Sequence, residues 1–222
     1  MAGKAVPVPE DLFGRDGGSL MVVLQGGNAL APLRPRGLGF DGLGKSVREL
    51  LLNEEIYARV VEGLMVGAEK FLWIVTADIK DLHVVRGRRA VPLLSVLADL
   101  VERGVGVRLI HAKEPGPRFR EDFDRYPVLV ESDLFERALC PRVHTKAVIA
   151  DGRRAFVGSP NLTGAGMGAK HADKRNFEAG FLTDEREDVK RLMEWTDELF
   201  LGEFCGRCRL RARCPDPLDG EG

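Results

Sequence analysis

Between residues 46 and 204, apolar residues recur with two periods, one typical of helices and one typical of strands. Apolar positions spaced by three and four residues, such as Ile56, Val60 and Leu64, predict an amphipathic helix over 46–68. The same reasoning predicts helices at 91–104, 119–126 and 184–204, and strands at 70–77, 105–112, 128–132, 144–151, 154–159 and 176–183. This alternation predicts an α/β fold, in which helices flank a mixed β-sheet.

The strands at 144–151 and 154–159 are joined by an Asp-Gly pair that is typical of a tight hairpin turn. Because successive side chains of a strand point to opposite faces, His144 and Lys146 share one face. An imidazole and an ammonium group therefore stand side by side near one end of the hairpin.

The first 46 residues are rich in Gly and Pro, which predicts an N-terminal extension of loops with a short strand at 19–25. The main folded domain is expected at 47–203, and residues 204–222 form a tail rich in Cys and Arg. The chain has 222 residues, of which 44% are hydrophobic and 30% charged, and its net charge is -1. This ordinary balance leaves the question of a nucleic-acid partner to local charge. No apolar run has the length of a membrane span, and no basic leader precedes the first one, so we expect a cytoplasmic protein without a membrane partner.

Further polar groups return to the end of the hairpin that carries His144 and Lys146. Gly158, Ser159 and Asn161 lie at the end of the second strand. Hydroxyl, amide, ammonium and backbone N–H groups all donate hydrogen bonds to the oxygens of an anion. Together with a neutral imidazole, they predict a site for a phosphate ester.

This arrangement resembles the HKD signature of the phospholipase D superfamily. The residues that carry the resemblance are His144, Lys146, Asp151, Gly158, Ser159 and Asn161. The strand with Asn176 and Glu178 resembles the strand that follows the signature in the family. The similarity extends over about 52–200, because the helix, turn and strand around 102–110 also match the family pattern.

The resemblance implies a phospholipase D-like catalytic domain whose phosphoryl transfer needs no metal ion. His144 would be the nucleophile and would form a phosphohistidine. Glu178 would accept the other ring N–H of that histidine and so fix its tautomer. The groups implied to hold the non-bridging oxygens are Lys146, Ser159, Asn161 and Asn176. Asp151 belongs to the signature too, but a structural role as the anchor of the turn is as well supported as a chemical one.

The family mechanism also uses a second histidine, from a second signature, to protonate the leaving oxygen. This chain contains one complete signature. His83 and His171 are not followed by Lys at the second position, and the pair His111 and Lys113 lacks the Asp and the Gly-Ser-x-Asn residues that follow His144 and Lys146. We therefore expect a two-fold homodimer in which both copies of His144 face one phosphate. One imidazole would be neutral and the other protonated, which predicts a bell-shaped pH–rate profile.

Four cysteines form a second candidate site. Cys205, Cys208 and Cys214 are clustered in the tail, and Cys140 lies far upstream. Clustered cysteines in a cytosolic protein favour metal binding over disulfides. Four thiolates suit a structural [4Fe–4S] cluster, with zinc as the alternative and unligated or redox-active thiols as a third possibility. The spacing resembles the iron–sulfur staple of some nucleases and glycosylases of other folds, whereas zinc modules more often use two close cysteine pairs.

These features together predict a phosphodiesterase that acts on nucleic acid, with DNA preferred over RNA. Arginines in the tail, together with basic residues near the signature, form a patch that would attract a phosphate backbone. The tail arginines are Arg207, Arg209, Arg211 and Arg213, and the others are Arg153, Arg154, Lys170, Lys174 and Arg175. The alternatives are a lipid phosphodiesterase and a nucleic-acid-binding module without catalysis, against which the intact signature argues.

Overall fold

The computed structural model describes residues 46–80 and 82–218. The extension up to residue 45, with its predicted strand at 19–25, lies outside the described residues, as do Asp81 and residues 219–222.

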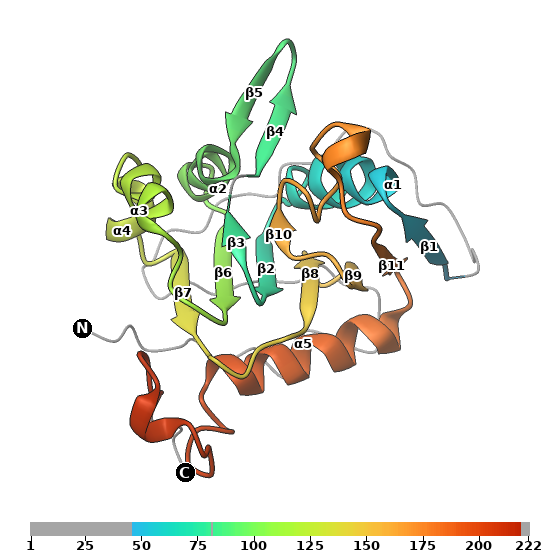
Figure 1. The fold of residues 1–222 in the computed structure, drawn as a ribbon. Coiled ribbons are helices and arrows are strands. Elements are labelled where there is room, and N and C mark those ends of the chain that lie inside the picture. Colours follow the sequence, from blue (N-terminus) through green and yellow to red (C-terminus); the bar gives the residue numbers. More distant parts are fainter. Residues whose placement is uncertain (1–45, 81, 219–222) are drawn as a thin grey trace, which may run out of the picture. The chain divides into compact units, whose positions relative to one another are not determined.

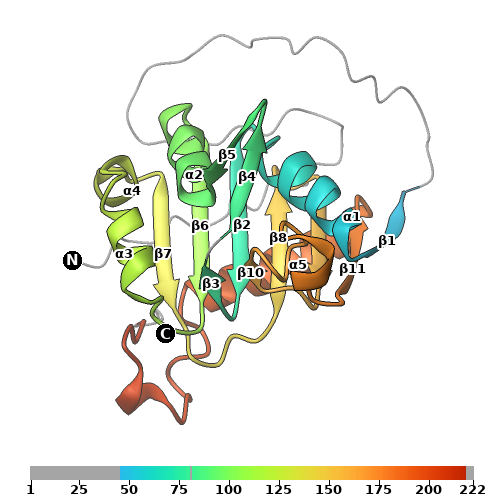
Figure 2. The same ribbon diagram turned by 45° about the horizontal axis from the view of Figure 1, so that its top comes forward.

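A seven-stranded mixed sheet forms the centre of the domain, with the order β1-β11-β9-β8-β2-β6-β7 (Figures 1 and 2). Strands β2, β6 and β7 are parallel to one another, and β8, β9, β11 and β1 continue the sheet in antiparallel pairs. The bounds of these strands are β1 Arg48–Leu52, β2 Phe71–Thr76, β6 Gly106–His111, β7 Phe135–Leu139, β8 Lys146–Ala150, β9 Arg154–Gly158 and β11 Ala179–Thr183. The predicted α/β fold with a mixed sheet is thus confirmed.

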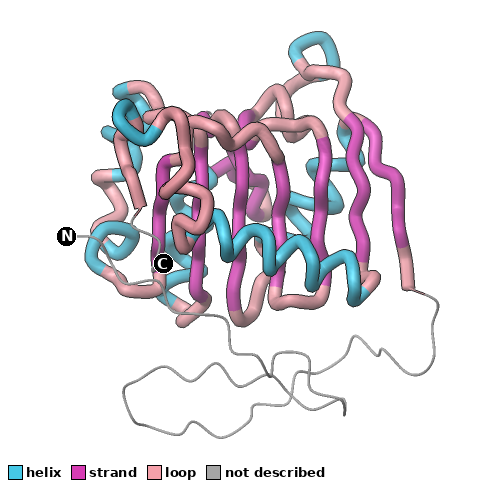
Figure 3. Tube along the Cα trace, turned by 90° about the horizontal axis from the view of Figure 1, so that it is seen from below, coloured by secondary structure: helices cyan, strands magenta, loops and turns pink. Residues whose placement is uncertain are grey.

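Helices cover both faces of the sheet. Helix α5 (Arg186–Phe200) crosses one face alone (Figure 3). The other face packs against α1 (Glu54–Ile56), the π-helical η2 (Tyr57–Met65) and α2 (Leu93–Glu102), with α3 (Pro117–Phe123) and α4 (Val128–Glu131) beside β7. Two small additions complete the fold: β3 (Ile79–Lys80) pairs with β10 (Leu162–Thr163), and β4 (His83–Arg86) forms a protruding hairpin with β5 (Arg89–Pro92).

The two faces of β8 belong to two separate apolar layers, as the alternation predicts. Val148 and Ala150 pack in the larger layer, with η2 and α2, whereas Ala147 packs in a smaller layer with Phe200 of α5. Lys146 has the same orientation as Val148, so its ammonium lies at the border of the larger core.

The structure adds β3, β4, β5, β7 and β10, which the sequence pattern did not predict, and the strand predicted at 144–151 begins only at Lys146. Two predicted elements are wrong in type. Residues 48–52 form strand β1 instead of the first turns of a helix, and the helical part begins only at Glu54. Asn53, with a φ of 51°, separates the two, since this left-handed conformation interrupts any regular element. Residues 128–131 form helix α4, and the edge strand predicted at 128–132 is in fact β7, at Phe135–Leu139.

Candidate active site

Lys146 and His144 meet at the start of β8. Lys146 is buried, and its Nζ donates to the carbonyl oxygen of His144 at 2.6 Å. The same Nζ lies 3.4 Å from Nδ1 and 3.5 Å from Nε2 of the exposed His144 ring. Among the described residues, no carboxylate pairs with this ammonium. A buried cation without an anionic partner is costly unless a ligand supplies the negative charge, so the pair is suited to bind an anion.

Two glycines shape the sheet beside Lys146. Gly158 of β9 pairs with Lys146, and Gly180 of β11 pairs with Gly158. A Cβ at Gly158 would lie 2.7 Å from the Phe156 ring, and one at Gly180 would lie 2.4 Å from it. The absence of side chains at these two positions therefore makes room for the ring of the fully buried Phe156.

Glu178 gathers two of the predicted oxygen-binding residues. Its carboxylate accepts hydrogen bonds from Ser159 Oγ and, at 3.0 Å, from Asn176 Nδ2. Lys146, Gly158 and Gly180 lie opposite one another on β8, β9 and β11. Because His144 precedes Lys146 by two residues and Glu178 precedes Gly180 by two, the same register places His144 and Glu178 at one level of the sheet edge. The structure records no hydrogen bond between Glu178 and His144 in its described part, so the orienting role of Glu178 stays a prediction.

Asn161 is tied to the loop that follows β2. Its Oδ1 accepts the backbone N–H of Asp78 at 3.1 Å, which leaves the NH₂ group of the amide as a donor. Asp78 forms ion pairs with Lys80 at 3.2 Å and with Lys113 at 3.4 Å. Asp78 thus links Asn161 to Lys80 and Lys113, which the sequence alone did not indicate.

Asp151 lies at the opposite end of β8 from His144. Its carboxylate accepts the backbone N–H groups of Glu69, Lys70 and Phe71 at distances from 2.7 to 3.1 Å. With a φ of 58° and Gly152 at 65°, Asp151 makes the hairpin turn that the Asp-Gly pair predicts. These contacts describe an anchor that joins the turn to the start of β2.

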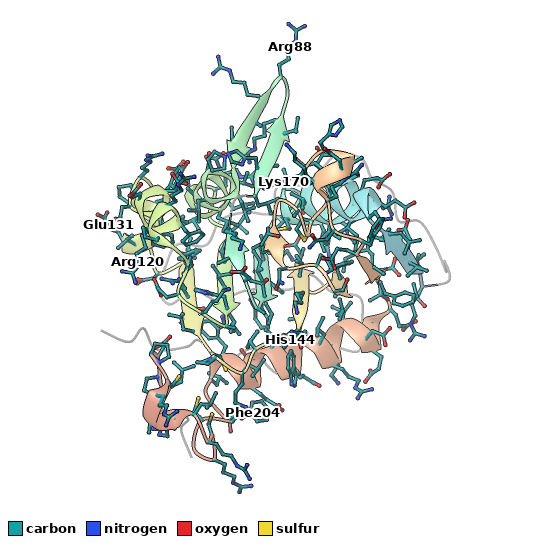
Figure 4. The ribbon with its side chains drawn as sticks, in the orientation of Figure 1. Arg88, Arg120, Glu131, His144, Lys170 and Phe204 are labelled. Atoms are coloured by element: carbon teal, nitrogen blue, oxygen red, sulfur yellow. The ribbon has the colours of Figure 1, made fainter. Side chains whose placement is uncertain are left out.

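The basic residues of the sequence do not form a single patch around His144. Arg153 and Arg154 follow the turn at Asp151, so they lie at the far end of the hairpin. Lys170 and Lys174 belong to the exposed loop that leads to Asn176, and Arg175 pairs with Glu54 in that region. Arg88 stands at the tip of the β4–β5 hairpin (Figure 4).

The other histidines have separate environments. His111 is buried: its Nδ1 donates to the carbonyl oxygen of Lys113 at 2.8 Å, and its Nε2 accepts from Arg137 at 2.7 Å. Burial, and then the positive charge of Arg137, lower the pKa of His111 below its ordinary value. His171 is exposed and pairs with Asp173 in the turn η3 (Ala172–Lys174), and His83 lies on the β4–β5 hairpin.

All four cysteines line one cavity of about 210 Å³ between the tail and the β7–β8 connection. They are free thiols, and His144 lies on the wall of the same cavity. Figure 4 labels His144 and Phe204, which both line the cavity. Burial raises the pKa of the Cys205 thiol, with smaller contributions from the other three cysteines. The backbone N–H of Leu210 and the Arg142 side chain lower the pKa of the Cys208 thiol.

Two residues near the site were missed by the sequence analysis. Asn53 holds the backbone of Glu178: its Oδ1 accepts the Glu178 N–H at 3.1 Å, and its own N–H donates to the Glu178 carbonyl oxygen at 2.9 Å. Phe177, between Asn176 and Glu178, is 97% exposed. Asn53 could have been found as an Asn that interrupts a helical pattern, but no local signal marks Phe177.

Comparisons with known proteins agree on the fold. The family described as "Cardiolipin synthase, PLD-like domain" matches residues 63–200. A comparison with curated protein sequences finds no significant match. Among the described residues, no helix is both long and apolar enough to cross a membrane.

Similar solved structures include NucT from Helicobacter pylori, with a TM-score of 0.52 and 15% identity over 71% of this chain and 96% of that one. Nuc from Salmonella typhimurium, described as a phospholipase D family member, has a TM-score of 0.50 and 16% identity over 69% of this chain and 93% of that one. A phosphatidylserine synthase from Haemophilus influenzae has a TM-score of 0.50 and 17% identity over 69% of this chain and 38% of that one.

Proposed function

Because the chain belongs to the phospholipase D superfamily, we propose that it is a phosphodiesterase that cleaves DNA through a phosphohistidine on His144. The observation that carries this proposal is the buried Lys146 ammonium, which contacts His144 and has no carboxylate partner in the described residues. A phosphodiester placed against the imidazole would supply the missing negative charge. Because the lysine is held in place before substrate arrives, it can stabilise the charge that develops at phosphorus.

The proposed reaction has two displacements. A ring nitrogen of His144 attacks phosphorus, so that a P–N bond forms and the P–O bond to the leaving group breaks. The leaving oxygen takes a proton from a second imidazole. Water then attacks the phosphohistidine and gives its proton to that imidazole, and the P–N bond breaks. Lys146 and the amide of Asn161 would hold the non-bridging oxygens throughout, together with Ser159 and Asn176.

The second imidazole would come from a second copy of the chain. In the described residues the other histidines do not face His144: His111 is buried with both ring nitrogens engaged, and His171 pairs with Asp173 on a loop. A two-fold dimer would supply the partner's His144 without any further residue.

The surface beside α5 supports such a dimer. Leu50, Phe181 and Val157 are paired neighbours on β1, β11 and β9, and all three are exposed. Val157 and Phe181 border a depression of about 580 Å³ that is also lined by Trp195 of α5. An exposed apolar row of this kind marks an interaction surface. A second copy is the occupant that would also complete the active site.

Charge near the nucleophile favours a polyanionic substrate. Arg142 and Arg211 line the same cavity as His144, and the tail continues with the exposed Arg207 and Arg209. Arginine binds phosphate with its planar fork, and a row of such groups follows a nucleic-acid backbone.

An activity panel in EDTA tests the proposal. Purified protein would be given single-stranded DNA, double-stranded DNA, RNA and phospholipid vesicles. We expect DNA cleavage by the wild type, a loss of about 10³-fold or more in His144→Ala, and normal cleavage by His171→Ala, which changes an exposed histidine outside the site.

Three outcomes would overturn the proposal. Cleavage that survives in His144→Ala would reject the nucleophile. Release of headgroups from vesicles without DNA cleavage would favour the lipid phosphodiesterase. DNA binding without any cleavage would favour the binding module.

A further inference from the structure

The cysteine-lined cavity brings together residues that are far apart in the chain. Cys140 precedes β8, whereas Cys205, Cys208 and Cys214 lie in the tail after α5. These four are all the cysteines of the chain, and all four line the same cavity of about 210 Å³. Each thiol is partly buried and free. Four thiols on one small cavity are a ligand set for a metal centre.

The tail has little else to hold it in place. In residues 201–218 the regular structure is a single 3₁₀ turn, η4 (Arg211–Arg213), and most of the side chains are exposed. Successive turns repeat every three residues, with N–H groups of Cys208, Arg211 and Cys214 donating to the carbonyl oxygens of Cys205, Cys208 and Arg211. A segment with so small an apolar core generally needs a disulfide or a metal as a staple.

Two polar contacts already clamp the tail against β7. The backbone N–H of Leu139 donates to Asp216 at 3.0 Å, and the Cys214 thiol lies 4.0 Å from the Leu139 carbonyl oxygen. These contacts hold the tail cysteines on the side of the sheet where Cys140 lies. The ligand set is thus assembled across the tail and the sheet, instead of within the tail alone.

We propose that Cys140, Cys205, Cys208 and Cys214 bind a [4Fe–4S] cluster, which fixes the tail against the segment that carries His144. Each thiol loses its proton on binding and becomes a thiolate ligand to one iron. The cluster has a structural role here, and the proposed phosphoryl transfer requires no electron from it. The proposal does not depend on the substrate or on the reaction of the active site.

The volume of the cavity, about 210 Å³, leaves room for a centre larger than a single zinc ion. A tetrahedral zinc site with Zn–S bonds of about 2.3 Å needs sulfur atoms roughly 3.8 Å apart. In residues 46–80 and 82–218, no three His, Cys, Asp or Glu side chains are grouped closely enough to hold a metal ion, so the thiols would have to move together on binding. A cubane cluster holds its four cysteines farther apart, because each sulfur binds a different iron. The cavity is also several times the volume of about 30 Å³ that one water molecule takes in the liquid.

Charge at the cavity also fits a cluster. With four thiolates, an oxidised [4Fe–4S] centre carries a net charge of about -2. Arg142 and Arg211 both line the cavity and can offset this charge.

The proposed cluster would affect the active site by holding the segment from Cys140 to His144 in place. The cavity wall continues from Cys140 through Arg142 and Val143 to His144. A cluster ligated by Cys140 would therefore restrict the motion of the segment that presents the imidazole.

Metal analysis of anaerobically purified protein tests this proposal independently of activity. We expect about four iron and four acid-labile sulfide per chain, with broad absorbance in the visible blue. Cys208→Ser and Cys214→Ser should each lose most of this iron and colour. Arg209→Ser, which places a serine at an exposed tail position and keeps all four cysteines, should keep both.

Several results would overturn the proposal. These are zinc as the only bound metal, no metal after anaerobic purification and cluster reconstitution, and a disulfide between two of the four cysteines in protein kept anaerobic. Full retention of iron in both serine variants would show that the iron is bound elsewhere. If a variant folds poorly, circular dichroism at the protein's working temperature would separate loss of the cluster from loss of the domain.

Discussion

The Nζ of Lys146 lies 2.6 Å from the carbonyl oxygen of His144 and 3.4 Å from its Nδ1. The hydrogen bond to the carbonyl oxygen fixes the position of the ammonium group. The contact with the ring places the positive charge of Lys146 beside the imidazole, where a phosphate under attack by His144 would lie. Lys146 is the first residue of β8 and His144 lies two residues before it, so the start of this strand holds both groups together.

Replacing Lys146 by methionine should affect activity and stability differently. We expect Lys146→Met to lower kcat/KM by about 10²- to 10³-fold, since it removes a preorganised positive charge from the transition state. The free energy of unfolding should stay the same or rise, because a buried ammonium without an anionic partner is replaced by an apolar side chain of similar length. Steady-state kinetics and thermal unfolding measure the two effects. A variant that loses stability but keeps its activity would show that the lysine is structural.

Replacing Asp151 should have the reverse effect. Asp151→Ala removes the acceptor of three backbone N–H groups and puts alanine at a positive φ, so we expect the free energy of unfolding to fall by about 3 kcal/mol. Asp151→Asn, which tolerates the turn and retains one acceptor oxygen, should lose less. The kcat of the folded fraction should change little in both variants. A large fall in kcat without a shift in the unfolding temperature would assign Asp151 a chemical role.

The environment of His111 predicts how stability depends on pH. The pKa of His111 is lower in the folded chain than in the unfolded chain. Below the ordinary value of about 6.5, His111 therefore binds a proton in the unfolded chain but not yet in the folded chain, which favours unfolding. This contribution to stability is complete above pH 6.5 and is lost as the pH falls toward the lowered pKa, by at most about 1.4 kcal/mol per pH unit. Chemical unfolding of the wild type and His111→Asn over this range measures it. Identical pH dependence in the two proteins would contradict this account.

The dimer can be tested at Phe181. Phe181→Lys puts an ammonium group into the proposed interface, next to Arg48 and Arg191, and should weaken self-association by about 100-fold or more. DNA cleavage should fall with the dimer fraction, as followed by light scattering and activity at the same concentrations. Val85→Lys is the matched control, because Val85 is about as exposed as Phe181 but lies on the β4–β5 hairpin, outside the proposed interface. A Phe181→Lys monomer with full activity would refute the shared site.

Much of the site could be predicted because it depends on local patterns. The Asp-Gly turn predicts the hairpin of β8 and β9, which brings Ser159 back to the end where Lys146 lies. The side chains of His144 and Lys146, which the alternation predicts on one face, are in contact. What failed depends on tertiary contacts. The run at 48–52 has no periodicity that separates helix from strand, and it becomes a strand because it pairs with β11. The run at 128–131 is too short to be assigned by pattern, and β7 was missed because polar residues interrupt it.

The positions of the arginines show that nearness in the sequence does not predict nearness to His144 in space. Arg153 and Arg154 lie within ten residues of His144 along the chain, yet a whole strand separates them from it in space. Arg211 is far away in sequence but lines the cavity that His144 borders. Only the fold brings the tail to the nucleophile.

The configuration at phosphorus tests the central claim most directly. A phosphorothioate diester of known configuration would be cleaved in isotopically labelled water, and the configuration of the product would be determined. Two successive in-line displacements, the first by His144 and the second by water, each invert the centre, so the account predicts net retention. Net inversion would mean that water attacks the diester directly, and would contradict the phosphohistidine intermediate.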